Sequence, residues 1–150
     1  MLSWHFLWDC ASIDLGYVKG GINMQLGLKK EFKGTPQEAD HAVRAALQAV
    51  GFGIITEIDF QKVVAEKLNT EIEPYTILGA CNPRFANQAL EYDKEAGLLL
   101  PCNVIVYQEH DHTFISAVDP VAMLGIIDHP DLKNLAVEVK ALLEKAMATI

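Results

Sequence analysis

Cysteine is scarce in this chain of 150 residues: there are three, Cys10, Cys81 and Cys102, and no Cys-x-x-Cys pair. An odd, sparse set does not form a disulfide framework, and the spacing fits neither a zinc ribbon nor a thioredoxin motif. Basic residues are also few, 12 against 20 acids, for a formal net charge of −8. This balance argues against nucleic acid as a partner, because phosphate binding needs an excess of lysine and arginine. No apolar run approaches the roughly 18 residues of a membrane-spanning helix, so no membrane partner is expected.

Motifs for catalysis are missing as well. There is no Gly-x-Ser-x-Gly nucleophile elbow, and Gly51-Phe52-Gly53 lacks the third glycine and the following helix of a phosphate-binding loop. We therefore assign no catalytic residue and no metal ligand, and we leave the cofactor open. Binding is favoured over catalysis. The sparse cysteines are typical of reduced thiols, which predicts a cytoplasmic protein.

The chain is rich in apolar residues, which make up 51% of it. A chain of this length and composition is typical of one compact domain that holds its core without disulfides or metals. We place this domain at residues 24–150.

Residues 1–23 differ from the rest, since they contain both tryptophans, Trp4 and Trp8, and lack the basic region of a secretory signal. The peptide Lys19-Gly-Gly-Ile-Asn-Met24 can be encoded by DNA that contains AAAGGAGG, a bacterial ribosome-binding sequence, just upstream of a methionine codon. We expect translation to start at Met24, with residues 1–23 as a leader outside the domain. The alternative is an added N-terminal strand or oligomer arm with exposed aromatic residues. The intact mass of the native protein would decide between them.

From Met24 onward, strand and helix patterns alternate. Thr35-Pro36-Gln37-Glu38 combines a capping box with a proline at the first helical position, which predicts a helix ending near Gly51. Strands are expected at 24–32, 53–58, 75–81, 102–107 and 113–118. Further helices are expected at 59–68, from 82–83 onward, around 123–124, and from 130 to near the end.

Two finer expectations concern these elements. Helix 59–68 should turn Val63, Val64 and Leu68 inward, and Gln108 to His112 should form the turn between the last two strands. This order of elements predicts an α+β domain with a curved, mixed or mostly antiparallel sheet backed by helices. One layer of helices leaves the second sheet face for a dimer partner or a ligand.

Four segments in register carry a family resemblance: 51–59 (GFGIITEID), 78–83 (LGACNP), 99–104 (LLPCNV) and 116–120 (SAVDP). In this order they resemble the domain of unknown function 302 family, over roughly residues 24–148. The resemblance implies a fold similar to the TATA-binding-protein-like group and a homodimer. The family has no established reaction, so the resemblance implies little chemistry.

The doubled dipeptides Cys81-Asn82 and Cys102-Asn103 are the candidate binding residues. If their strands are neighbours, two thiols at one sheet end could bind a soft metal or act in redox exchange. The helix that starts at Pro83, and Arg84, could lower the pKa of Cys81. The structural alternative is that the cysteines fill the core and Asn82 caps a helix.

Other polar groups give weaker signals. His110 and His112 form a His-x-His in the expected turn, where solvated side chains are usual and no third ligand is evident. Glu57 and Asp59 share a strand face, but Asp59 is explained as a helix cap. Two functions have support in the sequence, while a third, a plain homodimeric scaffold with a protein partner, has no specific evidence. The first is a cytoplasmic homodimeric module that binds a small apolar or amphipathic ligand on its sheet face, and the second is a thiol-dependent redox or metal-handling protein that uses Cys81 and Cys102.

Overall fold

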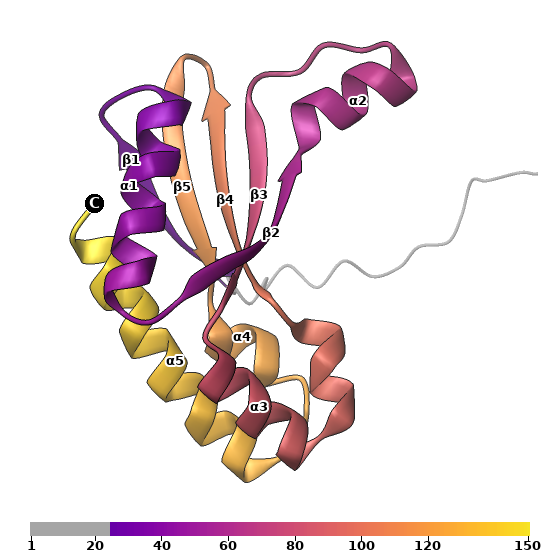
Figure 1. The fold of residues 1–150 in the computed structure, drawn as a ribbon, viewed down its shortest axis with the longest axis vertical. Coiled ribbons are helices and arrows are strands. Elements are labelled where there is room, and N and C mark those ends of the chain that lie inside the picture. The colour runs from indigo at the N-terminus through magenta and orange to yellow at the C-terminus, as the bar shows by residue number, and fades with distance from the viewer. Residues whose placement is uncertain (1–24) are drawn as a thin grey trace, which may run out of the picture.

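The computed structural model describes residues 25–150, so the expected leader 1–23 and the start at Met24 lie outside the described residues. An antiparallel sheet of five strands is backed on one face by helices (Figure 1). The elements in chain order are β1 (Gly27–Phe32), α1 (Pro36–Ala49), β2 (Gly53–Asp59), α2 (Phe60–Leu68), β3 (Tyr75–Cys81), α3 (Pro83–Tyr92), the 3-10 helix η1 (Lys94–Leu99), β4 (Cys102–Glu109), β5 (His112–Val118), α4 (Pro120–Leu124) and α5 (Pro130–Ala148).

The strands are ordered β1-β5-β4-β3-β2, and every neighbouring pair is antiparallel. The predicted α+β class with a mostly antiparallel sheet is therefore confirmed. The first strand of the chain joins the sheet beside the last, which brings residues 27–32 next to 113–118. Side chains of the uncovered face thus come from segments far apart in the sequence.

Local signals at α1 and at the β4–β5 hairpin explain where these elements begin and end. Thr35 and Glu38 form the predicted capping box, with Glu38 Oε2 accepting from the Thr35 amide at 2.8 Å and Thr35 Oγ1 from the Glu38 amide at 3.2 Å. The hairpin turn is shorter than predicted. His110 and Asp111 alone form it, with φ of 51° and 66°, which are the left-handed conformations that a two-residue hairpin requires.

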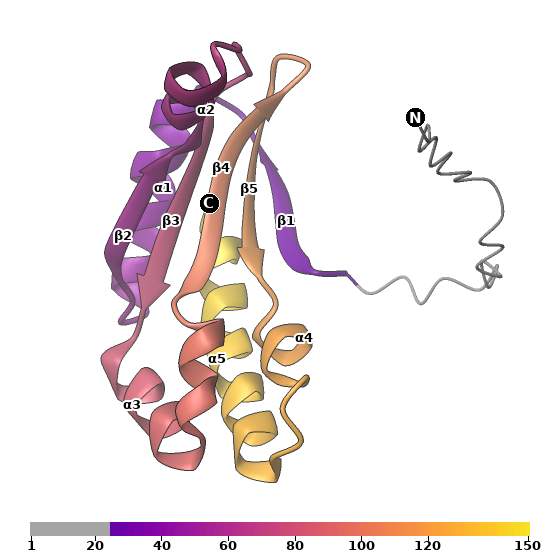
Figure 2. The same cartoon turned by 90° about the vertical axis from the view of Figure 1, so that its right-hand side faces the viewer.

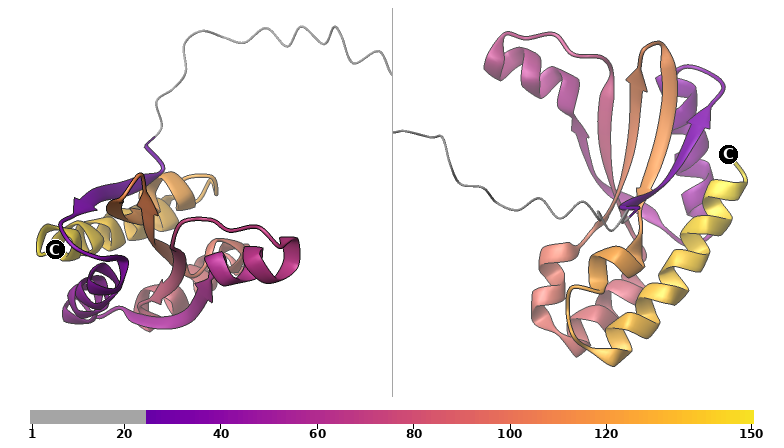
Figure 3. Two further views of the ribbon diagram at one scale, coloured as in Figure 1. Left: turned by 90° about the horizontal axis from the view of Figure 1, so that it is seen from above. Right: turned by 180° about the vertical axis from the view of Figure 1, so that it is seen from behind.

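The core lies between the sheet and two helices, α1 and α5, that cover the same face (Figures 1 and 3). Alternation along each strand turns every second side chain toward these helices. The largest fully buried residues of this layer are Val43, Leu47, Leu78, Val104, Ile115 and Leu143. A second, smaller cluster of Ala89, Ala96, Leu132 and Leu135 joins α3, η1 and the first half of α5 below the sheet.

The prediction that α2 turns an apolar face inward is wrong. The helix has no buried residue, and Val63 and Leu68 are 41% and 70% exposed. The apolar spacing correctly indicates a helix with one apolar side, but periodicity cannot say what covers that side. Seen from above, α2 projects away from the sheet on the side opposite α1 and α5 (Figure 3, left).

The second face of the sheet is open in the part of the chain that the structure describes. Figure 2 looks onto this face, with the strands side by side and no helix lying across them. Below the strands lie α3, η1 and α4, and above them α2. None of the helices within residues 25–150 is long and apolar enough to cross a membrane.

Candidate functional site

Aromatic side chains form a continuous row across the open face. Tyr75 of β3, Tyr107 of β4 and Phe114 of β5 stack in this order, with ring centroids 5.5 Å and 5.4 Å apart. Phe60, the first residue of α2, meets Tyr75 edge-on at 5.9 Å. At the other end, the ring of His112 lies 6.5 Å from that of Phe114. We call these five residues the aromatic row.

The row follows from strand register. Tyr107 is directly opposite Tyr75 on one side and Phe114 on the other, so the three rings project from the same face at the same height. One step further along, Ile77 faces Ile105 and continues the apolar surface. The open face therefore offers flat rings and aliphatic side chains, the lining that apolar parts of ligands prefer.

An ammonium of the described chain lies over this row. Lys29 Nζ of β1 is 4.1 Å from the ring centroid of Phe114 and 5.2 Å from that of Tyr107, within the range of a cation–π interaction. It is also 4.0 Å from the carboxylate of Glu109. Hydrogen bonding with Tyr107 raises the pKa of Lys29 above its ordinary value, so the ammonium stays charged at neutral pH.

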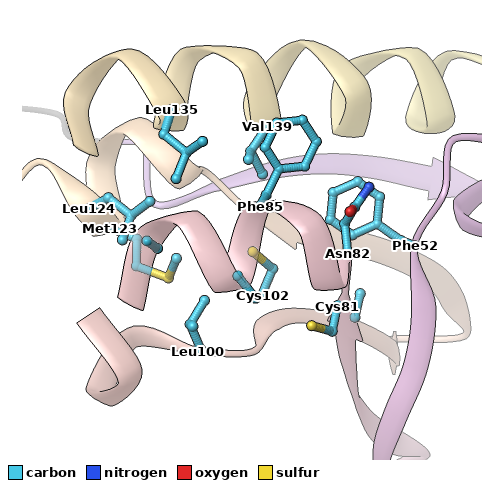
Figure 4. A pocket seen from close by; sticks show the side chains of 13 residues that line it. Phe52, Cys81, Asn82, Phe85, Leu100, Cys102, Met123, Leu124, Leu135 and Val139 are labelled. Carbon is cyan, nitrogen blue, oxygen red and sulfur yellow. The ribbon is translucent and has the colours of Figure 1, made fainter. Parts of the chain in front are cut away.

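The second candidate place is a small cavity between the lower end of the sheet and the helices. Ala80 is directly opposite Cys102, so Cys81 and Cys102 come from neighbouring strands, and both side chains line the cavity (Figure 4). Both are free thiols. The remaining lining is almost entirely apolar and includes Phe52, Phe85, Leu100, Met123, Leu135 and Val139. The cavity holds about 20 Å³, room for a single water and not for an amphipathic ligand.

Burial acts on these thiols in the direction opposite to the expectation from sequence. It raises the pKa of Cys102 to about 11, helped by the neighbouring Cys81, and it raises the pKa of Cys81 as well. The expectation that the start of α3 or Arg84 lowers the pKa of Cys81 is therefore wrong. Because the side chains sit in an apolar wall, loss of solvation outweighs any favourable dipole. The redox role stays a prediction, with protonated thiols as its starting point.

The two asparagines of the doubled dipeptides do different things. Asn82 caps α3, with its Oδ1 accepting a hydrogen bond from the Arg84 amide at 3.2 Å, which is the structural alternative given above. Asn103 is exposed on β4 opposite Gly79. Asn82 and Asn103 therefore do not form one polar site around the two thiols.

The other polar candidates separate in space. His110 lies in the hairpin turn, whereas His112 Nδ1 is 2.6 Å from Glu31 Oε1. Glu57 binds Arg44 of α1 at 2.7 Å, and Asp59 caps α2, as predicted. Within residues 25–150 no group of three histidine, cysteine, aspartate or glutamate side chains is placed to hold a metal ion.

Three comparisons with known proteins bear on this arrangement. The family model described as "Domain of unknown function DUF302" matches residues 28–150. The chain belongs to the DUF302 family. A solved structure, the crystal structure of an uncharacterized conserved DUF302 protein from Bacillus stearothermophilus, matches with a TM-score of 0.79 and 26% sequence identity. The match covers 83% of this chain and 98% of that one. No curated protein matches the chain.

The DUF302 assignment confirms the resemblance drawn from the four sequence segments. It supports the fold but names no reaction or ligand.

The sequence analysis did not predict the aromatic row, although one signal was available. Tyr107 and Phe114 alternate with the buried residues of their strands, and Tyr75 lies at the same alternate position of β3. Only the strand register shows that they meet.

Proposed function

We propose that this DUF302 domain is a binding module of a reducing compartment such as the cytoplasm, and that its open sheet face binds a small amphipathic molecule. The aromatic row is the observation that carries this proposal. Half-buried rings on a surface that no helix of the described chain crosses are typical of a recognition surface. The cavity beside Cys81 and Cys102 is too small for such a molecule, which favours the open face as the binding surface. The two cysteines are free thiols, which supports a reducing compartment.

The test removes the central ring and keeps the apolar surface. Naphthol, a neutral bicyclic probe, is expected to bind the wild-type protein saturably in an NMR titration. Tyr107→Leu is expected to weaken this binding roughly tenfold, because an aromatic pair contributes about 0.5–1.5 kcal/mol beyond area burial. Shifted amide signals should come from β3, β4 and β5.

Tyr92→Leu provides the matched control, since Tyr92 is another partly exposed ring, stacked on His129 in the lower part of the molecule. It should leave naphthol binding unchanged. Absence of saturable binding to the wild-type protein, or equal losses in the two variants, would contradict the proposal.

We propose in addition that two copies of the chain associate through α2. This helix has nine residues, none of them buried, and isolated helices of this length are only marginally stable in water. Phe60, Val63 and Leu68 expose apolar surface on it. A second copy that covers this side supplies the packing that the helix lacks within its own chain.

Charged substitutions test this association. The double variant Val63→Lys with Leu68→Lys is expected to sediment as a monomer, whereas the wild-type protein sediments as a dimer. Val137→Lys serves as the control, because Val137 is 59% exposed on α5. A monomeric wild-type protein, or a double variant that remains dimeric, rules out α2 as the contact.

The thiol-dependent function is the alternative, and the pKa of Cys102 gives its test. With a pKa of about 11, Cys102 in the folded protein should hold far less thiolate at pH 8 than a free cysteine does. Its alkylation by iodoacetamide, followed by peptide mass spectrometry, should accelerate only as the pH approaches about 11. In urea the same thiol should react with an ordinary pKa. Rapid alkylation of Cys102 at pH 7 in the folded protein would instead favour the thiol function.

A further inference from the structure

The ammonium of Lys29 occupies the place that a cationic ligand would take on the aromatic row. Its nitrogen lies over two stacked rings, those of Phe114 and Tyr107, and faces a carboxylate of Glu109. Rings attract cations through their negative faces, and such contacts are the usual recognition of organic ammonium groups. The structure thus shows the row in contact with a positive charge from its own chain.

The charges around the row favour a cation over an anion. Glu31 and Glu109 both lie at the hairpin end of the open face, next to the rings of His112 and Phe114. Among the described strand residues that point to this face, Lys29 is the only lysine or arginine. Two carboxylates against one ammonium leave the local charge negative, in a protein whose overall formal charge is −8.

Lys29 is held loosely. Its side chain is 45% exposed, its ion pair with the half-exposed Glu109 spans 4.0 Å, and its other polar partner among the described residues is Tyr107. An exposed pair of this kind contributes little, and the long flexible stem of lysine can swing aside at small cost. A ligand with its own positive charge can therefore replace the ammonium without leaving the rings or Glu109 unpaired.

We propose that the open face binds an organic cation with a flat apolar body, such as an aromatic ammonium, and that Lys29 competes with it for the rings. This inference rests on the proposed function and adds the charge of the ligand. The flat body stacks beside Tyr75 and Tyr107, and the positive charge lies where Lys29 Nζ now sits, within reach of Glu109. Lys29 then prevents weakly binding cations from reaching the rings, and a tightly binding cation displaces it.

The test compares three bicyclic probes of similar size and different charge: N-methylquinolinium, naphthol and naphthalene sulfonate. Wild-type protein should bind N-methylquinolinium most tightly and the sulfonate most weakly. Lys29→Met should tighten N-methylquinolinium binding about threefold or more, since the competing contact is worth roughly 0.5–1 kcal/mol at an exposed site. Glu109→Gln should weaken it, and added salt should reduce the preference.

Lys94→Met removes the same charge from an exposed position at the start of η1, away from the sheet, and should leave all three affinities nearly unchanged. Lys29→Gln repeats the test with a polar side chain, in case the methionine itself attracts the probe. Tightest binding of the sulfonate, or weaker binding of N-methylquinolinium by Lys29→Met and Lys29→Gln, overturns the cation inference while the proposed function stands. Failure of all three probes to bind any of these proteins overturns both.

Discussion

Replacing Gly79 with valine is expected to lower the free energy of unfolding by about 3 kcal/mol, at the upper end of overpacking costs. Gly79 lies in β3, where the open face ends, and it is buried although no helix covers it. A Cβ atom there would overlap the hydroxyl of Thr56 and lie 2.7 Å from Cγ of Pro101. Thr56 is paired with Gly79 on the neighbouring strand β2, and the ring of Pro101 is fixed to its own backbone, so both stay close to the added side chain.

Three further variants identify the cause of this loss. Gly53→Ala places a methyl group where nothing lies within 4 Å and should change stability little. Thr56→Ala combined with Gly79→Ala removes the overlapping hydroxyl and should recover part of the loss caused by Gly79→Ala alone. Urea unfolding of the wild type and of the four variants, Gly79→Val included, provides the free energies. Equal costs for Gly53→Ala and Gly79→Ala would show that backbone freedom, and not the close contact, sets the effect.

Elements defined by neighbouring residues could be predicted from the sequence. The capping box at Thr35 and Glu38 needs only a spacing of three residues, and the structure contains both of its hydrogen bonds. The same holds for Asp59 and Asn82 as helix caps. Local hydrogen bonds of this kind depend little on the rest of the fold, which is why such signals are dependable.

The aromatic row could not be predicted, because it depends on strand order and register. Phe60 and Tyr75 are separated from Tyr107 and Phe114 by α3 and η1, and Lys29 reaches the row only because the first strand pairs with the last. A shift of one residue in any pairing would send the ring to the other face. Alternation identifies the face of a residue, but not its neighbours.

Two of the incorrect expectations, the inward face of α2 and the lowered pKa of Cys81, share one physical cause, the unknown environment of a side chain. For Val63 and Leu68, apolar spacing was interpreted as burial, yet nothing in the described chain covers them. For Cys81, the nearby helix start was considered able to lower the pKa, yet burial in an apolar wall raises it. In both cases the sequence pattern gives the chemical type and spacing of the residues, whereas their burial depends on the fold.

A second large loss of stability, about 3 kcal/mol, is expected for Asp119→Ala, from a lost helix cap and a lost charge-assisted hydrogen bond. Asp119 is only 9% exposed. Its carboxylate accepts from the amide of Val121, in the first turn of α4, at 2.9 Å, and binds Lys140 Nζ of α5 at 2.7 Å. Its own amide donates to the carbonyl of Leu26 at 2.9 Å. One side chain thus ties the end of β5 to two helices.

Asp128→Ala is the matched control. Asp128 makes an ion pair with Lys133 at the same distance, 2.7 Å, but its side chain is 98% exposed. Exposed pairs contribute little, so this variant should hardly change the free energy of unfolding in the same thermal or urea unfolding experiment. If Asp119→Ala and Asp128→Ala lower the free energy of unfolding by the same amount, burial does not control the strength of the Asp119 contact.

The pH dependence separates the charge of Asp119 from its packing. Burial by itself would raise the pKa of Asp119, but the hydrogen bonds from Lys140 and Val121 outweigh it and hold the pKa below its ordinary value. A group whose pKa is lower in the folded state stabilises the protein above its unfolded-state pKa, and this contribution is lost as the pH falls through the folded-state pKa. The stability difference between wild type and Asp119→Ala should therefore be full at pH 7 and shrink below about pH 4. A difference that stays constant down to pH 2 would show that the carboxylate charge contributes nothing, and that the loss comes from packing alone.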